Sequence, residues 1–414
     1  MKKLIAVLTA VCLVMAGALT WLSSKPGSDN LPAVLPSEAP ADPVETDAPG
    51  ETDAPAAEEG TEEAASIRTL DYDAMYLSRQ PDEVVMTVGG EDVTWAEYFY
   101  WLQYYGGQAE YYMSMFNAYG MPTDWDSELG SEGETYLSFV SSSAVNTLRE
   151  SASLELLSRE NGIQLTEDDL KDMQDTLAAD IAATCGENGT EEDFDEYLQT
   201  LYMNRAIYDR MVRINYLYPA AAAKLYGENG RLISDEEAAA YLADNGYLCS
   251  THILFLTTDM STGEAMDEAA VAEKKAQADA LVAELRAIED PAERVARFKE
   301  LKELYCEDGG KVSYPDGYLY PANTMYPIFE ETTAAQGEYE VSDPVLSQAG
   351  YHIIMTLPLD PDMVIFSSDG SSNTARTLLA AQKFNAVMDE NIEKCEVVMA
   401  PGFESFDVGQ FLVG

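Results

Sequence analysis

The amino-acid sequence predicts an α+β protein in which a mostly helical module carries one small domain with an antiparallel sheet. Three observations support this fold class. Large apolar residues recur at spacings of three and four through much of residues 67–245, which is typical of helices. Two strand-like apolar runs enclose amphipathic helices within residues 246–357. Residues 24–66 are acidic and rich in Pro and Ala, so they lack the apolar surface that a core requires.

The composition is strongly acidic and excludes several classes of function. The 414 residues include 74 Asp and Glu against 24 Lys and Arg, which gives a formal net charge of −50. A surface of this charge repels phosphate groups, so we expect no nucleic-acid partner. Five cysteines exclude a disulfide-dense scaffold, and two histidines leave few ligands for a conventional metal site. We therefore expect neither a metal nor a cofactor.

Residues 1–23 have the pattern of an export segment. Lys2 and Lys3 precede an apolar run that ends at Leu22, and Ala-Gly-Ala at 16–18 fits the rule for signal-peptide cleavage. At roughly 1.5 Å per residue the run is also about as long as a bilayer is thick, so an uncleaved membrane anchor is the alternative. Either form places the remaining chain outside the cytoplasmic membrane, anchored on its outer face or secreted.

Residues 24–66 are expected to form a disordered acidic linker. The sequence Glu-Thr-Asp-Ala-Pro occurs at 45–49 and again at 51–55. Such a stretch buries too little apolar surface to offset its ordering entropy. As a flexible chain it would span about 35–40 Å.

Residues 67–245 are predicted to form a helical, chaperone-like module. A strand at 84–88 ends at a Gly-Gly turn, and Thr94 with Glu97 forms a capping box that opens a helix. We assign the large side chains of this helix to a core: Trp95, Tyr98, Phe99, Trp101, Leu102 and Tyr105. Further helices are expected at 147–161, 168–183, 192–218 and 235–244, the last capped by Ser234 and Glu237.

A second aromatic and Met cluster follows the first, and two interpretations of it stay open. Its members are Tyr111, Tyr112, Met113, Met115, Phe116, Tyr119 and Met121. They could be core residues like those before them. Some could instead line a client-binding cleft, because Met and aromatic surfaces accommodate many partners.

Residues 246–357 are predicted to form the small α+β domain. Strands are expected at 249–256 and 350–355, which would pair antiparallel. Helices are expected between them at 264–288, after Asp290-Pro291, and at 325–331.

Three motifs of this domain resemble those of the parvulin-type peptidyl-prolyl isomerases. They are Thr-His-Ile-Leu at 251–254, Met-x-x-x-Phe-Glu at 325–330, and Ser-Asp-Pro-Val followed by Gly-Tyr-His-Ile-Ile within 342–354. The resemblance covers about residues 246–357 and implies an isomerase of Xaa-Pro peptide bonds.

The flanking regions resemble those of the PrsA/SurA-like foldases, in which an N-terminal chaperone region and a C-terminal helix enclose the isomerase. The matching stretches are 88–98 and 372–391. The resemblance implies that residues 358–414 complete the chaperone module. It also implies that the partners are unfolded or emerging exported proteins.

The chemistry of prolyl isomerisation indicates which residue types the site needs. Rotation about a peptide bond faces a barrier of about 18–20 kcal/mol, because twisting breaks amide resonance. No covalent step is required: a dry apolar slot for the proline ring and polar groups for the amide suffice. Met325 and Phe329, one helical turn apart, suit the slot, although plain core packing is the alternative.

The resemblance implies His252, Asp308 and His352 as the polar part of the site. Cys306 competes with Asp308, since the loop register leaves one or two residues open. Leu319 would supply the pocket leucine, because the family's Gly-Gly-Asp-Leu-Gly is replaced here by Ser-Tyr-Pro-Asp-Gly-Tyr-Leu-Tyr at 313–320.

This departure, with Ala349 where a Ser is usual, bears on turnover more than on the fold. The competing interpretation is therefore a scaffold or chaperone whose parvulin-like domain has lost turnover.

Two further arrangements use the cysteines of this domain. Cys249, His252, Cys306 and His352 are a possible zinc set, but residues three apart in a strand point to opposite faces. We favour a Cys249–Cys306 disulfide over zinc, because the exterior of the cell is oxidising.

Overall fold

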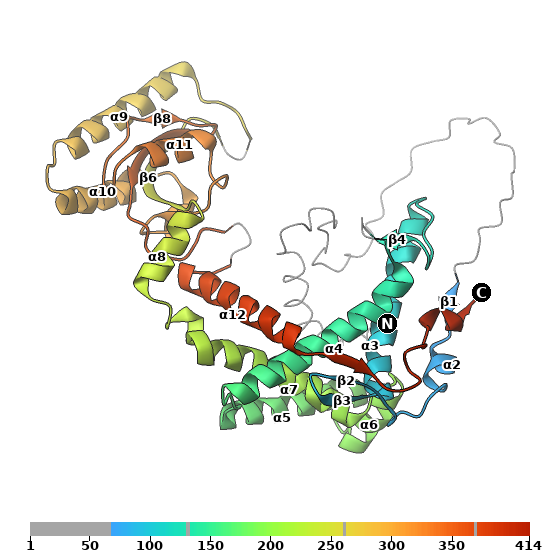
Figure 1. Cartoon of the computed structure of the whole chain (residues 1–414). Helices are drawn as coiled ribbons and strands as arrows, with labels where there is room; N and C mark the ends of the chain where they lie inside the picture. The colour runs from blue at the N-terminus through green and yellow to red at the C-terminus, as the bar shows by residue number, and fades with distance from the viewer. Residues whose placement is uncertain (1–67, 130–132, 260–261, 368–370) are drawn as a thin grey trace, which may run out of the picture. The chain divides into compact units, whose positions relative to one another are not determined.

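The computed structural model describes residues 68–129, 133–259, 262–367 and 371–414. These residues form two compact units (Figure 1). The first contains the described residues up to Ala221 together with Val387–Gly414, and the second is Ala222–Ala386. The predicted export segment 1–23 and all of the predicted linker 24–66 lie outside the described residues. Among the residues that are described, no helix is long and apolar enough to cross a membrane.

The first unit is mostly helical, as predicted. Helices α3 and α4 pack along each other, and α5 packs against α6. The helices are α2 (Tyr72–Tyr76), α3 (Trp95–Ala118), α4 (Tyr136–Glu160), α5 (Glu167–Cys185), α6 (Glu191–Gln199) and α7 (Arg205–Tyr226), which continues into the second unit. Helix α4 thus begins eleven residues before the predicted 147–161. The predicted helix 192–218 is two helices, because the chain turns at Tyr202, whose φ is +57°.

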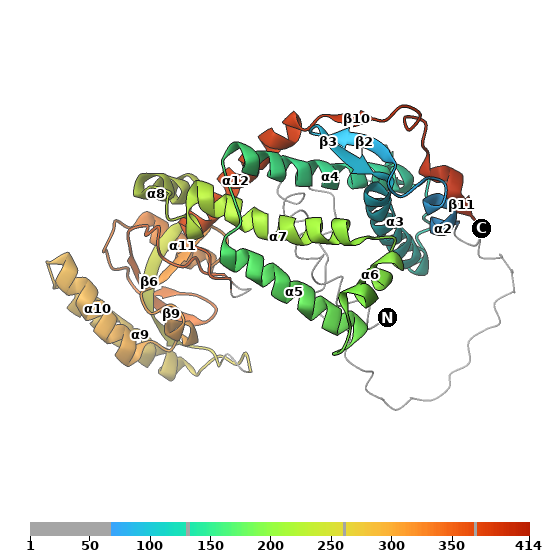
Figure 2. The same ribbon diagram turned by 90° about the horizontal axis from the view of Figure 1, so that it is seen from below.

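The C-terminal tail adds strands to this unit. One sheet has the order β10-β2-β3, and β11 pairs with β1, all antiparallel (Figure 2). The strands are β1 (Thr69–Leu70), β2 (Val84–Val88), β3 (Glu91–Thr94), β10 (Val397–Met399) and β11 (Leu412–Val413), and a separate hairpin joins β4 (Glu128–Leu129) to β5 (Glu134–Thr135). Gly89 and Gly90, both at positive φ, make the predicted turn between β2 and β3.

The two aromatic clusters of α3 have different environments. Trp95, Phe99 and Leu102 are almost completely buried, as predicted for core residues. In the second cluster Met113 is buried, but four large side chains are exposed: Tyr111, Tyr112, Tyr119 and Met121. The hydroxyl of Thr94 caps α3, whereas the Glu97 carboxylate binds Arg210 instead of closing the predicted capping box.

The second unit contains the predicted antiparallel sheet, with the strand order β7-β6-β9-β8. Helices α9 and α10 pack on one face of the sheet and α11 on the other. The elements are β6 (Leu248–Leu256), α9 (Glu268–Arg286), α10 (Pro291–Tyr305), β7 (Tyr318–Tyr320), α11 (Pro327–Ala335), β8 (Val345–Leu346) and β9 (Gly350–Thr356). The α+β fold class is confirmed.

Helices α8 (Asp235–Asp244) and α12 (Ala375–Lys394) contribute to the same unit. Leu242 of α8 and Ala375 of α12 share a buried apolar cluster with Cys249 and Leu319 of the sheet. These two helices thus cover sheet residues that α9 and α10 leave open. The domain boundaries at 245/246 and 357/358 stay predictions. The predicted capping box of Ser234 and Glu237 is present.

Candidate active site

The two histidines of the chain lie next to each other on one face of the sheet. The register of β6 and β9 pairs His252 with Ile354 and Leu254 with His352, so the histidines are diagonal neighbours. Their Nδ1 atoms are 3.2 Å apart, and both side chains are buried. The pairing of β6 with β9 therefore brings together two histidines that are 100 positions apart in the sequence.

Asp308 completes the polar network from the loop after α10. Its Oδ1 accepts a hydrogen bond from the Gly310 amide at 2.9 Å and so caps the 3₁₀ turn Gly309–Val312. Its Oδ2 lies 2.9 Å from His252 Nε2 and accepts a bond from the Tyr318 hydroxyl at 2.5 Å. At the other end of the network, Ser347 Oγ lies 2.7 Å from His352 Nε2.

With both rings neutral, one arrangement of protons satisfies every contact in this network. His252 Nε2–H donates to Asp308, which leaves its Nδ1 as an acceptor. His352 Nδ1–H then donates to His252 Nδ1, and the Ser347 hydroxyl donates to His352 Nε2. Each ring is thereby held in a single tautomer and orientation.

The surroundings of His352 and Asp308 set the charge of these two groups. Burial, together with the neighbouring His252, lowers the pKa of His352 to about 3, so this ring is neutral near pH 7. Burial alone would raise the pKa of Asp308. The hydrogen bonds from His252, Tyr318 and Gly310 outweigh burial and hold that pKa well below its usual range. A charged carboxylate therefore lies beside His252, and the ring of His352 on its other side is neutral.

Apolar side chains adjoin the network. The Phe329 ring on α11 is buried and lies edge-on to both imidazoles, with centroid distances of 5.2 Å to His252 and 5.4 Å to His352. Met325 is half-buried against the same cluster. The Glu330 carboxylate accepts hydrogen bonds from the backbone amides of residues 323–325, which fixes the loop that carries Met325.

Two predicted site residues are not part of this constellation. Leu319 is fully buried on the opposite face of the sheet, beside Cys249 and Ile365, because neighbouring residues of a strand alternate between faces. Cys306 is buried in the core under α9 and α10, where its Sγ accepts a hydrogen bond from the Leu254 amide. Between the two candidates for the acidic position, the structure therefore places Asp308 next to His252.

The predicted disulfide is also absent from the described residues. Cys249 and Cys306 are free thiols in two different apolar clusters. Burial raises the pKa of both thiols, that of Cys249 to about 12, which disfavours the thiolate form.

Some residues that the sequence did not single out complete the site. Ser347 places a hydroxyl beside His352, whereas position 349, where a Ser is usual, holds an Ala. Tyr318 and Tyr320 flank Leu319 and point to the face that carries His252, so the alternation of β7 would have identified them once its register was known. Tyr314 and Phe366 extend the aromatic cluster beyond Tyr318.

Residues 252–357 match the family described as "Rotamase: PPIC-type PPIASE domain". No curated protein matches the chain. The similar solved structures include PrsA from Bacillus anthracis (16% identity, 60% of this chain, 96% of that chain, TM-score 0.22) and PrsA from Bacillus subtilis (18%, 76%, 92%, 0.23). A third is PrsA from Bacillus cereus (13%, 76%, 92%, 0.26). The family match confirms the predicted parvulin-type domain and the isomerase class.

Proposed function

Residues 252–357 form a PPIC-type peptidyl-prolyl isomerase domain, and we propose that the whole chain is an extracytoplasmic foldase that isomerises Xaa-Pro bonds of unfolded exported proteins. The observation that carries the proposal is the satisfied Ser347–His352–His252–Asp308 network beside the ring of Phe329. The buried Phe329 and the half-buried Met325 supply apolar side chains next to this network.

The chemistry follows from the loss of amide resonance on rotation. A twisted prolyl amide has a more basic nitrogen and a less negative carbonyl oxygen than the planar form. Polar groups with fixed orientations favour that charge distribution, because they pay no reorganisation cost as the bond turns. In our proposal His252, Asp308 and His352 provide these groups, while Phe329 and Met325 exclude water from the ring.

The helical unit is proposed to hold the client while its prolines are isomerised. The four exposed side chains at the end of α3, Tyr111, Tyr112, Tyr119 and Met121, support this role. The export segment at 1–23 is proposed to deliver the chain across the membrane, with anchoring or secretion as the two outcomes of its processing.

The proposal is tested by prolyl exchange on Xaa-Pro peptides, measured by NMR with the full chain. We expect cis and trans resonances to exchange faster as substoichiometric protein is added. No enhancement, with retained binding of an unfolded protein, would favour the alternative of a scaffold that has lost turnover.

A further inference from the structure

We propose that Phe366, which lies beyond the residues matched by the isomerase family, is a specificity-determining residue of the prolyl site. With Tyr314 it would form an apolar wall for the side chain next to the substrate proline. This inference rests on the proposed function and concerns which Xaa-Pro sequences are preferred, not whether isomerisation occurs.

Phe366 belongs to the same apolar cluster as the site residues Phe329 and Met325. Its ring is 5.4 Å from Tyr318 and 5.2 Å from Tyr314, both close to edge-on. Tyr318 in turn lies 5.6 Å from His252 and donates its hydroxyl to Asp308. A continuous series of rings therefore leads from the imidazole pair to Phe366.

Burial changes along this series. Tyr318 is buried, whereas Tyr314 and Phe366 are each only half-buried. The outer two rings thus keep apolar surface in contact with solvent next to the network. Covering that surface with an apolar side chain of a bound peptide is favourable, and aromatic contacts add roughly 0.5–1.5 kcal/mol, a factor of about 2 to 12 in affinity.

The backbone around Phe366 is fixed to the outer edge of the sheet. Its amide donates to the Leu319 carbonyl at 2.6 Å, and the Ile365 amide donates to the Asn373 carbonyl at 2.8 Å. Ile365 forms a parallel bridge with Leu319 and is buried with it. The segment after β9 therefore returns along β7 and is held where its next side chain meets Tyr318.

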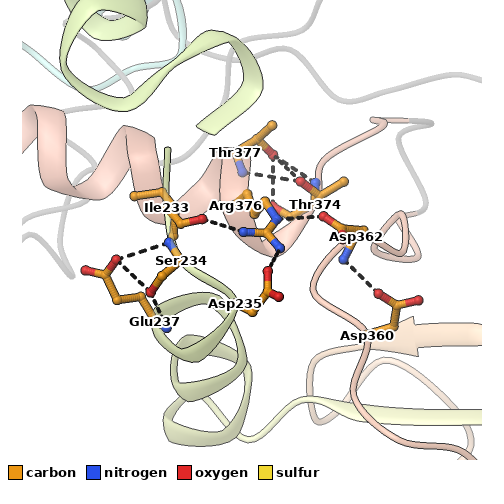
Figure 3. A network of polar contacts seen from close by, with 9 residues as sticks. All are labelled: Ile233, Ser234, Asp235, Glu237, Asp360, Asp362, Thr374, Arg376 and Thr377. Atoms are coloured by element: carbon orange, nitrogen blue, oxygen red, sulfur yellow. Dashed lines mark hydrogen bonds and ion pairs between the residues drawn. The ribbon is translucent and has the colours of Figure 1, made fainter. Parts of the chain in front are cut away.

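The guanidinium of Arg376, at the start of α12, links the segment that precedes Phe366 to α8 (Figure 3). Arg376 Nε donates to Asp362 at 2.6 Å, and its two terminal nitrogens donate to the Ile233 carbonyl and to Asp235. Its side chain is only 14% exposed, so the fork is held in one geometry. Asp362 lies four residues before Phe366, and we assign Arg376 as a positioning residue for that ring.

The experiment compares wild type with Phe366→Ala and Phe366→Leu on matched peptides. The residue on either side of proline is varied among Gly, Leu and Phe, and kcat and KM are obtained for each peptide by NMR exchange. In wild type we expect Leu and Phe to be preferred to Gly at one flanking position. Phe366→Ala should reduce that preference about three- to tenfold through KM. Phe366→Leu should retain most of the preference, because it keeps an apolar side chain.

Asp362 and Asp235, the two carboxylates that bind the Arg376 guanidinium, provide a matched pair of variants. Asp362→Asn loosens the segment that carries Phe366 and should lower the preference in the same direction, by a smaller factor. Asp235→Asn removes the ion pair to α8 and should leave the preference as in wild type. The melting temperature of each variant identifies any loss that is due to unfolding.

The outcomes separate this inference from the proposed function. A wild type that exchanges no peptide overturns the proposed function. A wild type that exchanges all peptides, with an unchanged preference in Phe366→Ala and Asp362→Asn, overturns only the role of Phe366. If Phe366→Ala does not fold, Asp362→Asn decides in its place.

Discussion

The two faces of the sheet in the second unit are built from the same strands but differ in chemistry: one is an apolar core and the other carries a polar network. On one face Ile253, Phe255 and Ile353 pack against α9 and α10 in a purely apolar core. On the other face His252 and His352 join a hydrogen-bonded network under α11. Because successive side chains of a strand point to opposite faces, a core residue and a site residue can be neighbours in the sequence. Substitutions on the two faces should therefore affect different measurements.

The largest effect is expected on the apolar face. Phe298 of α10 is 1% exposed, and Phe298→Ala should destabilise this unit by about 3–5 kcal/mol, because the cavity adds to the lost transfer energy. Denaturant unfolding of the full chain measures this loss. Leu304→Ala, on the same helix but 70% exposed, should change stability by less than about 0.5 kcal/mol. Equal losses for the two variants would contradict the assignment of this core.

The second largest effect is a loss of isomerase activity, and it is expected for substitutions on the polar face. His252→Ala or Phe329→Ala should lower kcat/KM for Xaa-Pro peptides on the order of 100-fold, the typical result of removing a preorganised group. Ile253→Val is the control from the next position of β6. It should cost about 0.5–1.5 kcal/mol of stability and leave kcat/KM of the folded protein unchanged. If His252→Ala and Phe329→Ala both isomerise at the wild-type rate, the site is assigned to the wrong residues.

The third effect is a loss of stability in acid that comes from the polar face. His352 has a pKa of about 3 in the fold and an ordinary value near 6.5 when unfolded, so the unfolded state binds more protons between these values. Its contribution is complete above about pH 6.5 and is lost as pH falls towards 3. Between pH 8 and pH 5 this amounts to about 2 kcal/mol. The pKa of Asp308 is also lowered, so its contribution is lost only below about pH 4.

Denaturant midpoints across this range test the assignment. His352→Gln removes the titrating ring, and the slope of stability between pH 5 and pH 7 should decrease in this variant relative to wild type. An unchanged slope would mean that other groups cause the acid sensitivity. Ile353→Val, at the adjacent position on the apolar face, should keep the wild-type slope.

The same alternation explains what the sequence could and could not predict. His252, His352 and Phe329 could be predicted as site residues because each sits in a local motif, and the antiparallel sheet followed from two apolar runs. Leu319 was predicted for the pocket but lies on the face away from the histidines, since the faces of β7 depend on its register with β6, which only the tertiary structure defines. Phe366 had no motif, because its place depends on a backbone contact with Leu319 across 47 residues.

The smallest effect concerns a phosphate on the residue before proline. Recognition of a phosphate dianion needs Arg or Lys donors. The loop after β6 carries carboxylates instead, at Asp259, Glu264 and Asp267. Lys274, the first cation after it in the sequence, forms an ion pair with Glu307. Lys311, three residues after Asp308, donates to the Cys306 carbonyl at 2.8 Å.

A phosphate at this position would therefore meet like charge, and each such contact costs on the order of 1 kcal/mol in a watery setting. We expect a phospho-Ser-Pro peptide to bind more weakly than its Ser-Pro counterpart, by about fivefold at low salt. The difference should shrink at physiological salt, because screening relieves repulsion between exposed charges. Replacing both Asp259 and Glu264 by Asn and Gln should shrink it as well, without affecting the unmodified peptide. Tighter binding of the phosphopeptide than of the unmodified peptide would contradict this prediction.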